Sequence, residues 1–262
     1  MKKIITTVSL ALLAISGSVN AADWSGKEIK LGIDPTYPPL EFKTADGKLT
    51  GFGVEITEAL CAELRARCTW VEISFDGMIP GLLAKKFDAI ASSMTINQKR
   101  MEQIAFTNKI SNAPARLVVK RGSDLLPTAE SLKGKRVGVA QGSSQEAYAL
   151  AVLRPAGVDV IAYKGQDQVY EDLIVGRLDA SLQASIAASD GFLNKPQGKD
   201  FMFAGPALED PKFFGLGDGI GLRKKDVALR EDLNQALATI LANGTYARIN
   251  KKYFDFDVYG AK

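Results

Sequence analysis

The chain has 262 residues, 46% of them apolar and 24% charged, and it contains no histidine. This length allows one large domain or two domains of about 100 residues, and the missing histidine removes the commonest general base and metal ligand. The net charge is only +3, which gives no reason to expect a nucleic-acid partner.

The first 21 residues have the pattern of a secretory signal peptide. Lys2 and Lys3 precede a mostly apolar stretch from Ile4 to Ile15, and small residues lead to a cleavage point after Ala21. A membrane anchor is the poorer alternative, because the apolar stretch is short for a span and ends in polar residues. We therefore expect residues 1–21 to be removed on export, which takes away two lysines and lowers the net charge from +3 to +1.

Short β-rich runs alternate with helical patterns along the rest of the chain. The expected strands are residues 28–33, 68–73, 87–92, 115–120, 135–140, 159–163 and 178–183. Apolar residues recur at helical spacing in residues 54–67, 144–155 and 226–244. Asp226 is expected to cap the last of these helices and Gly244 to end it. This alternation predicts an α/β protein with largely parallel sheets.

Two pairs of segments echo each other. Residues 82–92 resemble residues 173–183, and residues 29–37 resemble residues 135–144, in the same order along the chain. Chance is a fair alternative for either pair alone, but together they favour two lobes of similar plan. Ligands of such sheets bind beyond the carboxyl ends of the strands, so the turns after these strands border one cleft if the lobes face each other.

Cys61 and Cys68 are the only cysteines. In an exported protein a single pair indicates one structural disulfide. A metal site needs more ligands than this pair, and a redox motif normally has the spacing Cys-x-x-Cys. We expect no metal and no other cofactor.

Polar side chains follow two of the expected strands. Ser92, Ser93 and Thr95 come where the strand 87–92 ends, with Arg100 in the next helix. Hydroxyls there are also ordinary helix caps, and a helical arginine commonly lies on a solvated face. Three hydroxyls beside a guanidinium nevertheless suit a carboxylate, which arginine binds through two hydrogen bonds.

The turn after the strand 135–140 repeats this arrangement. Gly142 lets the backbone approach a ligand, and Ser143, Ser144 and Gln145 follow it. The segment is not a P-loop, because the Gly-Lys-Ser/Thr ending is missing. We therefore expect a carboxylate to be held from both sides of the cleft.

Three further residues are weaker candidates. Asp34 ends the first strand and could pair with a ligand cation, although Asp before Pro is often only a turn former. Tyr37 and Phe75 could enclose an aliphatic or planar part of the ligand, although a phenylalanine is more commonly in a core.

These segments resemble the periplasmic solute-binding proteins of ABC transporters for polar amino acids, in the branch for lysine, arginine, ornithine and histidine. The likeness covers nearly the whole mature chain. It rests on the cysteine pair and on GIDPTYPPLEFK (32–43), FDGMIPGLLAKKFDAIASSMTINQKR (75–100), SLKGKRVGVAQGSSQE (131–146) and KKYFDFDVYG (251–260).

The resemblance implies two α/β lobes, each a mostly parallel sheet flanked by helices, joined by two hinge strands and closing on a ligand in the cleft between them. Lobe 1 would comprise residues 22–112 and 216–262, and lobe 2 residues 113–215, with crossings near 112–115 and 209–217. The protein would be a periplasmic monomer that delivers its ligand to an inner-membrane permease.

The resemblance also implies a role for each candidate residue. The α-carboxylate of the ligand would lie on Arg100, Thr95 and Ser144, and its α-ammonium near Ser93. The side-chain cation would meet Asp34, surrounded by Ser92, Ser143 and Gln145, and the aliphatic stem would pack on Tyr37 and Phe75.

Two positions depart from the family's pattern. Ala184 stands where this branch usually has an aspartate that pairs with the α-ammonium, and Gly53 replaces an acidic residue after Gly-Phe. The loss at 184 would cost about 10- to 100-fold in affinity. Either the ligand lacks a primary α-ammonium, as an opine does, or water and Ser185 replace the carboxylate.

The alternative is an enzyme. Some relatives of this fold are periplasmic dehydratases acting on cyclohexadienyl substrates, and such chemistry requires a positioned general acid. The turn at Ala184 and Ser185 offers none, so we expect a binding protein without catalytic residues.

Overall fold

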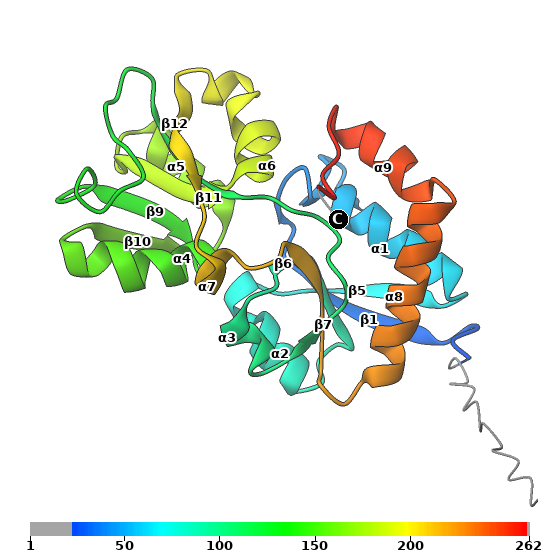
Figure 1. The fold of residues 1–262 in the computed structure, drawn as a ribbon. Coiled ribbons are helices and arrows are strands. Elements are labelled where there is room, and N and C mark those ends of the chain that lie inside the picture. Colours follow the sequence, from blue (N-terminus) through cyan, green and yellow to red (C-terminus); the bar gives the residue numbers. More distant parts are fainter. Residues whose placement is uncertain (1–22, 261–262) are drawn as a thin grey trace, which may run out of the picture.

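The computed structural model describes residues 23–260, so the expected signal peptide lies outside the described residues. The chain forms two lobes, each a five-stranded sheet covered by helices (Figure 1). This arrangement confirms the predicted two-lobed α/β fold. Within the described range, none of the helices combines the length and the apolar character that a membrane span requires.

The first lobe is built on the strand order β5-β1-β6-β13-β7. Its strands are β1 (Glu28–Ile33), β5 (Arg67–Glu72), β6 (Ala89–Thr95), β7 (Ala105–Phe106) and β13 (Asp218–Leu222). Its helices are α1 (Phe52–Glu63), α2 (Met78–Leu83), α3 (Gln98–Met101), α8 (Val227–Ala242), α9 (Thr245–Tyr253) and the 3-10 turn η1 (Phe75–Gly77). A small sheet contains β2 (Thr36–Tyr37), β3 (Glu41–Lys43) and β4 (Leu49–Thr50).

The second lobe is built on the strand order β10-β9-β11-β8-β12. Its strands are β8 (Ala115–Lys120), β9 (Arg136–Ala140), β10 (Asp159–Tyr163), β11 (Ala180–Ala184) and β12 (Phe201–Leu208). Its α-helices are α4 (Ser144–Tyr148), α5 (Gln166–Ile174), α6 (Ser185–Ala188) and α7 (Pro211–Phe214). Shorter π and 3-10 turns are η2 (Ala149–Leu153), η3 (Arg154–Ala156), η4 (Ser189–Leu193) and η5 (Pro196–Gly198).

Both sheets are mostly parallel, as expected, but each contains one strand that runs against the other four. In the first sheet β1 pairs in parallel with β5 and β6, whereas β13 pairs antiparallel with β6 and β7. The second sheet repeats this pattern, with β8 antiparallel to β11 and β12. The reason is the crossing: a chain that arrives from the other lobe enters at the carboxyl ends of the parallel strands and therefore runs against them.

Two segments connect the lobes and lie side by side. Residues 107–114 lead into β8, residues 209–217 lead back into β13, and Ser111 forms a β-bridge with Asp218. Gly217 has φ 103°, and a Cβ there would lie 2.4 Å from the Ser111 carbonyl oxygen, so only glycine fits this close approach. The lobe boundaries themselves stay a prediction.

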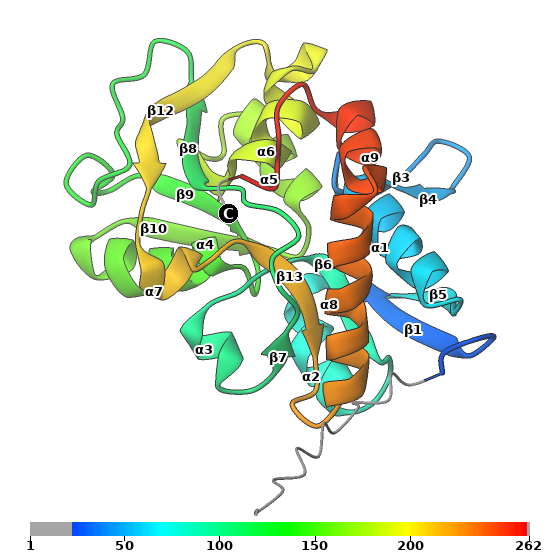
Figure 2. The same cartoon turned by 45° about the vertical axis from the view of Figure 1, so that its right-hand side comes forward.

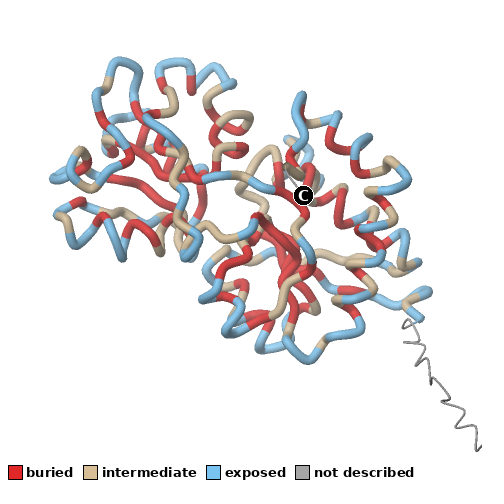
Figure 3. The backbone as a smooth tube through the Cα atoms, viewed as in Figure 1, coloured by how far each residue is buried: buried red, intermediate tan, exposed pale blue. Residues whose placement is uncertain are grey.

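The C-terminal helices complete the first lobe rather than forming a separate unit. Leu229, Leu233, Leu237 and Ile240 form the buried face of α8 that the sequence predicted. Helices α8 and α9 pack beside α1 in both views (Figures 1 and 2). In each lobe the burial is greatest along the central strands (Figure 3), as expected for sheets covered on both faces.

Two helix ends differ from expectation. Asp226 precedes α8, but its side chain makes no capping hydrogen bond; its carboxylate lies 2.5 Å from Nε of Arg223 instead. The helix expected over residues 144–155 is regular only to Tyr148 and then continues as π and 3-10 turns. Pro155 has no N–H to donate, so a regular helix cannot continue through it.

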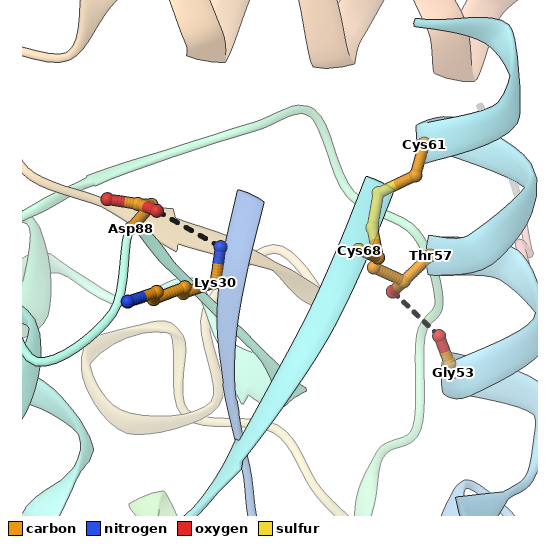
Figure 4. The surroundings of a disulfide bond; sticks show 6 residues. All are labelled: Lys30, Gly53, Thr57, Cys61, Cys68 and Asp88. Carbon is orange, nitrogen blue, oxygen red and sulfur yellow. Dashed lines mark hydrogen bonds between the residues drawn. A yellow bond between two sulfur atoms is a disulfide. The ribbon is translucent and has the colours of Figure 1, made fainter. Parts of the chain in front are cut away.

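The disulfide is confirmed. Cys61 of α1 and Cys68 of β5 are joined with a Cα–Cα distance of 6.2 Å (Figure 4), within the range that disulfides span. The bond ties α1 to the edge strand of the first sheet. Nearby, the Thr57 hydroxyl donates to the Gly53 carbonyl at 2.7 Å, inside the same helix.

Candidate functional site

A cavity lies between the two lobes, with about 670 Å³ of unfilled space when the solvent at its mouth is included. All the ligand-binding residues expected from the sequence line it. They are Asp34, Tyr37, Phe75, Ser92, Ser93, Thr95, Arg100, Ser143, Ser144, Gln145 and Ala184. The structure therefore brings together side chains from four strand ends, namely those of β1, β6, β9 and β11.

Arg100 is the buried cation of this cavity, with only 7% of its surface exposed. Its guanidinium donates to the Thr95 carbonyl at 2.8 Å and, across the cleft, to the Gly142 carbonyl at 3.1 Å. The ring of Phe75 lies 5.5 Å from the guanidinium carbon. Burial lowers the pKa of Arg100 to about 10, partly offset by the charge of Asp218, so the guanidinium stays charged at neutral pH.

Arg100 is held by the start of its own short helix. The Asn97 side chain accepts from the Arg100 amide at 3.0 Å, which caps α3. The same side chain donates to the Ser144 hydroxyl of the second lobe at 3.2 Å. Asn97 therefore positions the guanidinium and joins the two sides of the cleft at once.

Asp34 is a buried anion that directly follows the C-terminal end of β1. Its carboxylate accepts hydrogen bonds from the Thr36 amide at 3.2 Å, the Thr36 hydroxyl at 2.8 Å and the Phe75 amide at 2.9 Å. Burial raises the pKa of Asp34, and these hydrogen bonds oppose that rise. Among residues 23–260, no basic side chain forms an ion pair with it, so a ligand cation can supply the missing charge.

The second-lobe turn is shaped for close approach. Gly142 has φ 76°, and a Cβ there would lie 2.7 Å from the Cα of Asp76 in the first lobe. Ser143 caps α4 by accepting from the Glu146 amide at 3.0 Å. A capping hydroxyl accepts, so its own proton can still be donated to a ligand.

Sequence reasoning missed a second buried acid in the cavity, Asp218. It is the first residue of β13, is 8% exposed and accepts from the Ser111 hydroxyl at 3.3 Å. Burial raises the pKa of Asp218 to about 7, opposed by Thr95, Arg100 and Ser111. Its only signal in the sequence is its place in the glycine-rich stretch GLGDG, where the chain returns to the first lobe.

The lining also contains polar residues near Ala184. Gln183 accepts from the Tyr170 hydroxyl at 2.6 Å and from the Gln166 amide group at 2.8 Å. The amide nitrogen of Gln183 is buried, and no partner for it exists in the described part of the chain. Lys164 is a further lining residue, and its side chain is exposed.

Glu41 lies behind the cavity and explains the glycine at position 53. Its buried carboxyl accepts from the Ser93 hydroxyl at 2.7 Å, and burial raises its pKa well above the usual range. A Cβ on Gly53 would meet the Glu41 carboxyl oxygen directly. The departure at Gly53 therefore makes room for Glu41, a role that the sequence did not reveal. Across residues 23–260, no cluster of acidic or cysteine side chains is placed to hold a metal ion.

The chain is similar to known solute-binding proteins. The sequence model of the bacterial extracellular solute-binding proteins, family 3, matches residues 29–256. The histidine-binding periplasmic protein of Escherichia coli K12 is 50% identical over 99% of this chain and its own full length, and the lysine/arginine/ornithine-binding periplasmic protein of the same organism is 49% identical over the same shares. A solved ancestral arginine-binding protein bound to arginine has a TM-score of 0.80 at 32% identity, over 87% of this chain and 98% of that one.

Proposed function

Because the chain belongs to the bacterial extracellular solute-binding proteins of family 3, we propose that it captures a cationic amino acid, or a derivative of one, in the cleft between its lobes. Relatives about half identical over their whole length are periplasmic proteins that bind histidine or lysine, arginine and ornithine. In this proposal the protein is the soluble component of an ABC importer and works in the periplasm.

One observation carries the choice of ligand: the buried charges of the cavity. Asp34 and Asp218 are carboxylates, Arg100 is the buried cation, and the fourth charged lining residue, Lys164, is exposed. When both acids are ionised, as a ligand cation beside each would favour, two carboxylates against one guanidinium leave an excess of one negative charge in a desolvated space. A ligand with one carboxylate and two cations balances both the number and the sign of these groups.

The ligand would lie along the cleft. Its α-carboxylate binds Arg100, Thr95 and Ser144, and its side-chain cation reaches Asp34. Asp34 is already fixed by Thr36 and Phe75, so the ligand meets a preformed anion and little side-chain entropy is lost on binding. Tyr37 and Phe75 pack against the aliphatic stem, and Ser92, Ser143 and Gln145 lie around the cation.

Closure would follow from contacts to both lobes at once. Arg100 and Asn97 of the first lobe already bond to Gly142 and Ser144 of the second. A ligand held by these residues favours the closed arrangement over an open one, since only the closed arrangement offers both sets of contacts. The closed form is then the one that an inner-membrane permease would recognise.

Equilibrium binding tests this proposal. Purified protein without residues 1–21 is titrated with arginine, ornithine, lysine, histidine, octopine and nopaline, by calorimetry and by thermal shift. L-glutamate serves as the control, because its second carboxylate would face Asp34. We expect at least one cationic ligand to bind and glutamate not to bind; no binding by any of the six would refute the proposed ligand class.

The enzyme alternative is tested separately. Asp218 is a buried carboxyl with a pKa of about 7, and it supplies an acid that the sequence did not show. Incubation with prephenate or arogenate should leave the aromatic absorbance unchanged if the protein only binds. A steady increase that Asp218→Asn abolishes would instead establish dehydratase activity.

A further inference from the structure

The wall of the cavity at Ala184 carries no charge. Ala184 ends β11, is 7% exposed and lies next to the neutral residues Gln183 and Ser185. A ligand ammonium enclosed on that side would lose its hydration without gaining an anion, which is costly in a buried site. The α-ammonium of an amino acid therefore needs a carboxylate elsewhere in the lining.

Asp218 lines the cavity beside the residues that would hold the α-carboxylate. It is the cross-strand neighbour of Thr95, at the register position where β13 begins and β6 ends. Thr95 and the nearby Arg100 are the residues that would hold the α-carboxylate. Only one carbon separates the two charged groups of an α-amino acid, so fixing the carboxylate there confines the ammonium to the surroundings of Asp218.

In the described part of the chain, the carboxylate of Asp218 is not in direct contact with a cation. This carboxylate accepts a hydrogen bond from the Ser111 hydroxyl at 3.3 Å, and the neighbouring Thr95 side chain helps to hold its pKa down. Arg100 attracts it, but the guanidinium directs its hydrogen bonds to the Thr95 and Gly142 carbonyls, and within residues 23–260 no ion pair includes Asp218.

We infer that Asp218 is the specificity-determining residue that binds the α-ammonium of the ligand, from the hinge side of the first lobe rather than from the second-lobe turn at Ala184. The inference rests on the proposed function and deepens it. It replaces the two explanations that the sequence suggested for Ala184, because a primary α-ammonium then has its carboxylate and no opine or water is needed.

Two neighbouring groups are poorer candidates. Glu41 is 1% exposed, lies outside the lining of the cavity and is already bonded to the Ser93 hydroxyl. Asp34 is fixed at the end of β1 by Thr36 and Phe75 and would be occupied by the side-chain cation. Burial also raises the pKa of Asp218 to about 7, and an ammonium beside it would offset that loss of hydration.

The test compares each amino acid with its analogue that lacks the α-amine. The pairs are arginine with 5-guanidinopentanoate, lysine with 6-aminohexanoate, ornithine with 5-aminopentanoate, and histidine with imidazolepropanoate. The amino acid that the unaltered protein binds best is titrated beside its analogue, with the unaltered protein and with Asp218→Asn. Asp218→Ser is used if the asparagine variant does not fold.

We expect Asp218→Asn to lower the affinity for the amino acid by roughly 10- to 100-fold. The affinity for its analogue should fall by less than about fivefold. A merely structural role for Asp218 would lower the affinity for both ligands equally, and that result would overturn the inference.

A second check uses a double variant. Ala184→Asp combined with Asp218→Asn should recover affinity for the amino acid but not for its analogue. If the unaltered protein bound none of the six ligands named above, the proposed function would fail with the inference. If it bound only octopine or nopaline, or bound an amino acid and Asp218→Asn kept the preference over the analogue, only the inference would fail.

Discussion

Replacing Arg100 with alanine is the perturbation that most strongly affects the proposed site. The side chain is 7% exposed, and among residues 23–260 it is the only buried basic residue that lines the cavity. Its loss would leave the ligand carboxylate desolvated and without its cation. It would also remove the hydrogen bond to the Gly142 carbonyl, which joins the lobes.

The expected magnitude follows from these contacts. Removing one partner from a buried ion pair typically costs about 3–5 kcal/mol, which corresponds to roughly 150- to 5,000-fold in affinity. Arg100→Lys should lose less affinity, because lysine keeps the charge and gives up only the bidentate hydrogen bonding of the guanidinium.

Calorimetry with the best-bound amino acid measures the effect. Arg154→Ala is the matched control, because Arg154 is an exposed arginine of η3 that does not line the cavity. The Arg154→Ala variant should bind the amino acid with the same affinity as the unaltered protein, and thermal melts should show that all variants fold. A loss below about fivefold for Arg100→Ala, the value of an exposed pair, would refute the assignment of the carboxylate to Arg100.

Three further predictions concern stability. The pKa values of Asp218, Asp34 and Glu41 are raised in the folded protein, so it binds protons that the unfolded chain does not. The melting temperature of the ligand-free protein should therefore increase when the pH is lowered from 8 to 5.5. A decrease over that interval would contradict these assignments. Replacing Cys61 and Cys68 together with serine should cost about 2–3 kcal/mol of unfolding free energy, from the short loop that the disulfide closes, without changing ligand affinity in calorimetry; an altered affinity would show that the disulfide shapes the cleft. Gly53→Asp should destabilise the protein by about 1–3 kcal/mol in chemical denaturation, because a side chain there meets the Glu41 carboxyl, and Glu41→Ala should relieve the effect; equal destabilisation with and without Glu41→Ala would refute this cause.

The two lobes could be predicted because each local signal agrees with the fold. The strands at 28–33, 115–120 and 159–163 were located to the residue, since β-rich runs bounded by polar turns leave little freedom. The buried face of α8 followed from its apolar spacing. The candidate residues at the strand ends could be named because parallel strands bring their carboxyl ends to one edge of a sheet.

The rest depends on contacts between segments far apart in the sequence. Asp218 joins the cavity only because the chain returns from the second lobe beside Thr95, 123 residues away in the sequence. The role of Gly53 depends on Glu41, which packs against it although it lies in a different element. The one antiparallel strand of each sheet follows from the direction in which the chain enters after each crossing. A local sequence pattern cannot predict these features, because each depends on the position of a second segment in the folded chain.

The most direct test of the account is the identity of the small molecule that the protein retains when purified from its own periplasm. The protein is denatured, the released compound is identified by its mass, and its amount per chain is measured. The account predicts one molecule per chain with a carboxylate, a primary α-ammonium and a second cation. A retained compound without the α-ammonium would contradict the role of Asp218, and one without any cationic group would contradict the proposed ligand class.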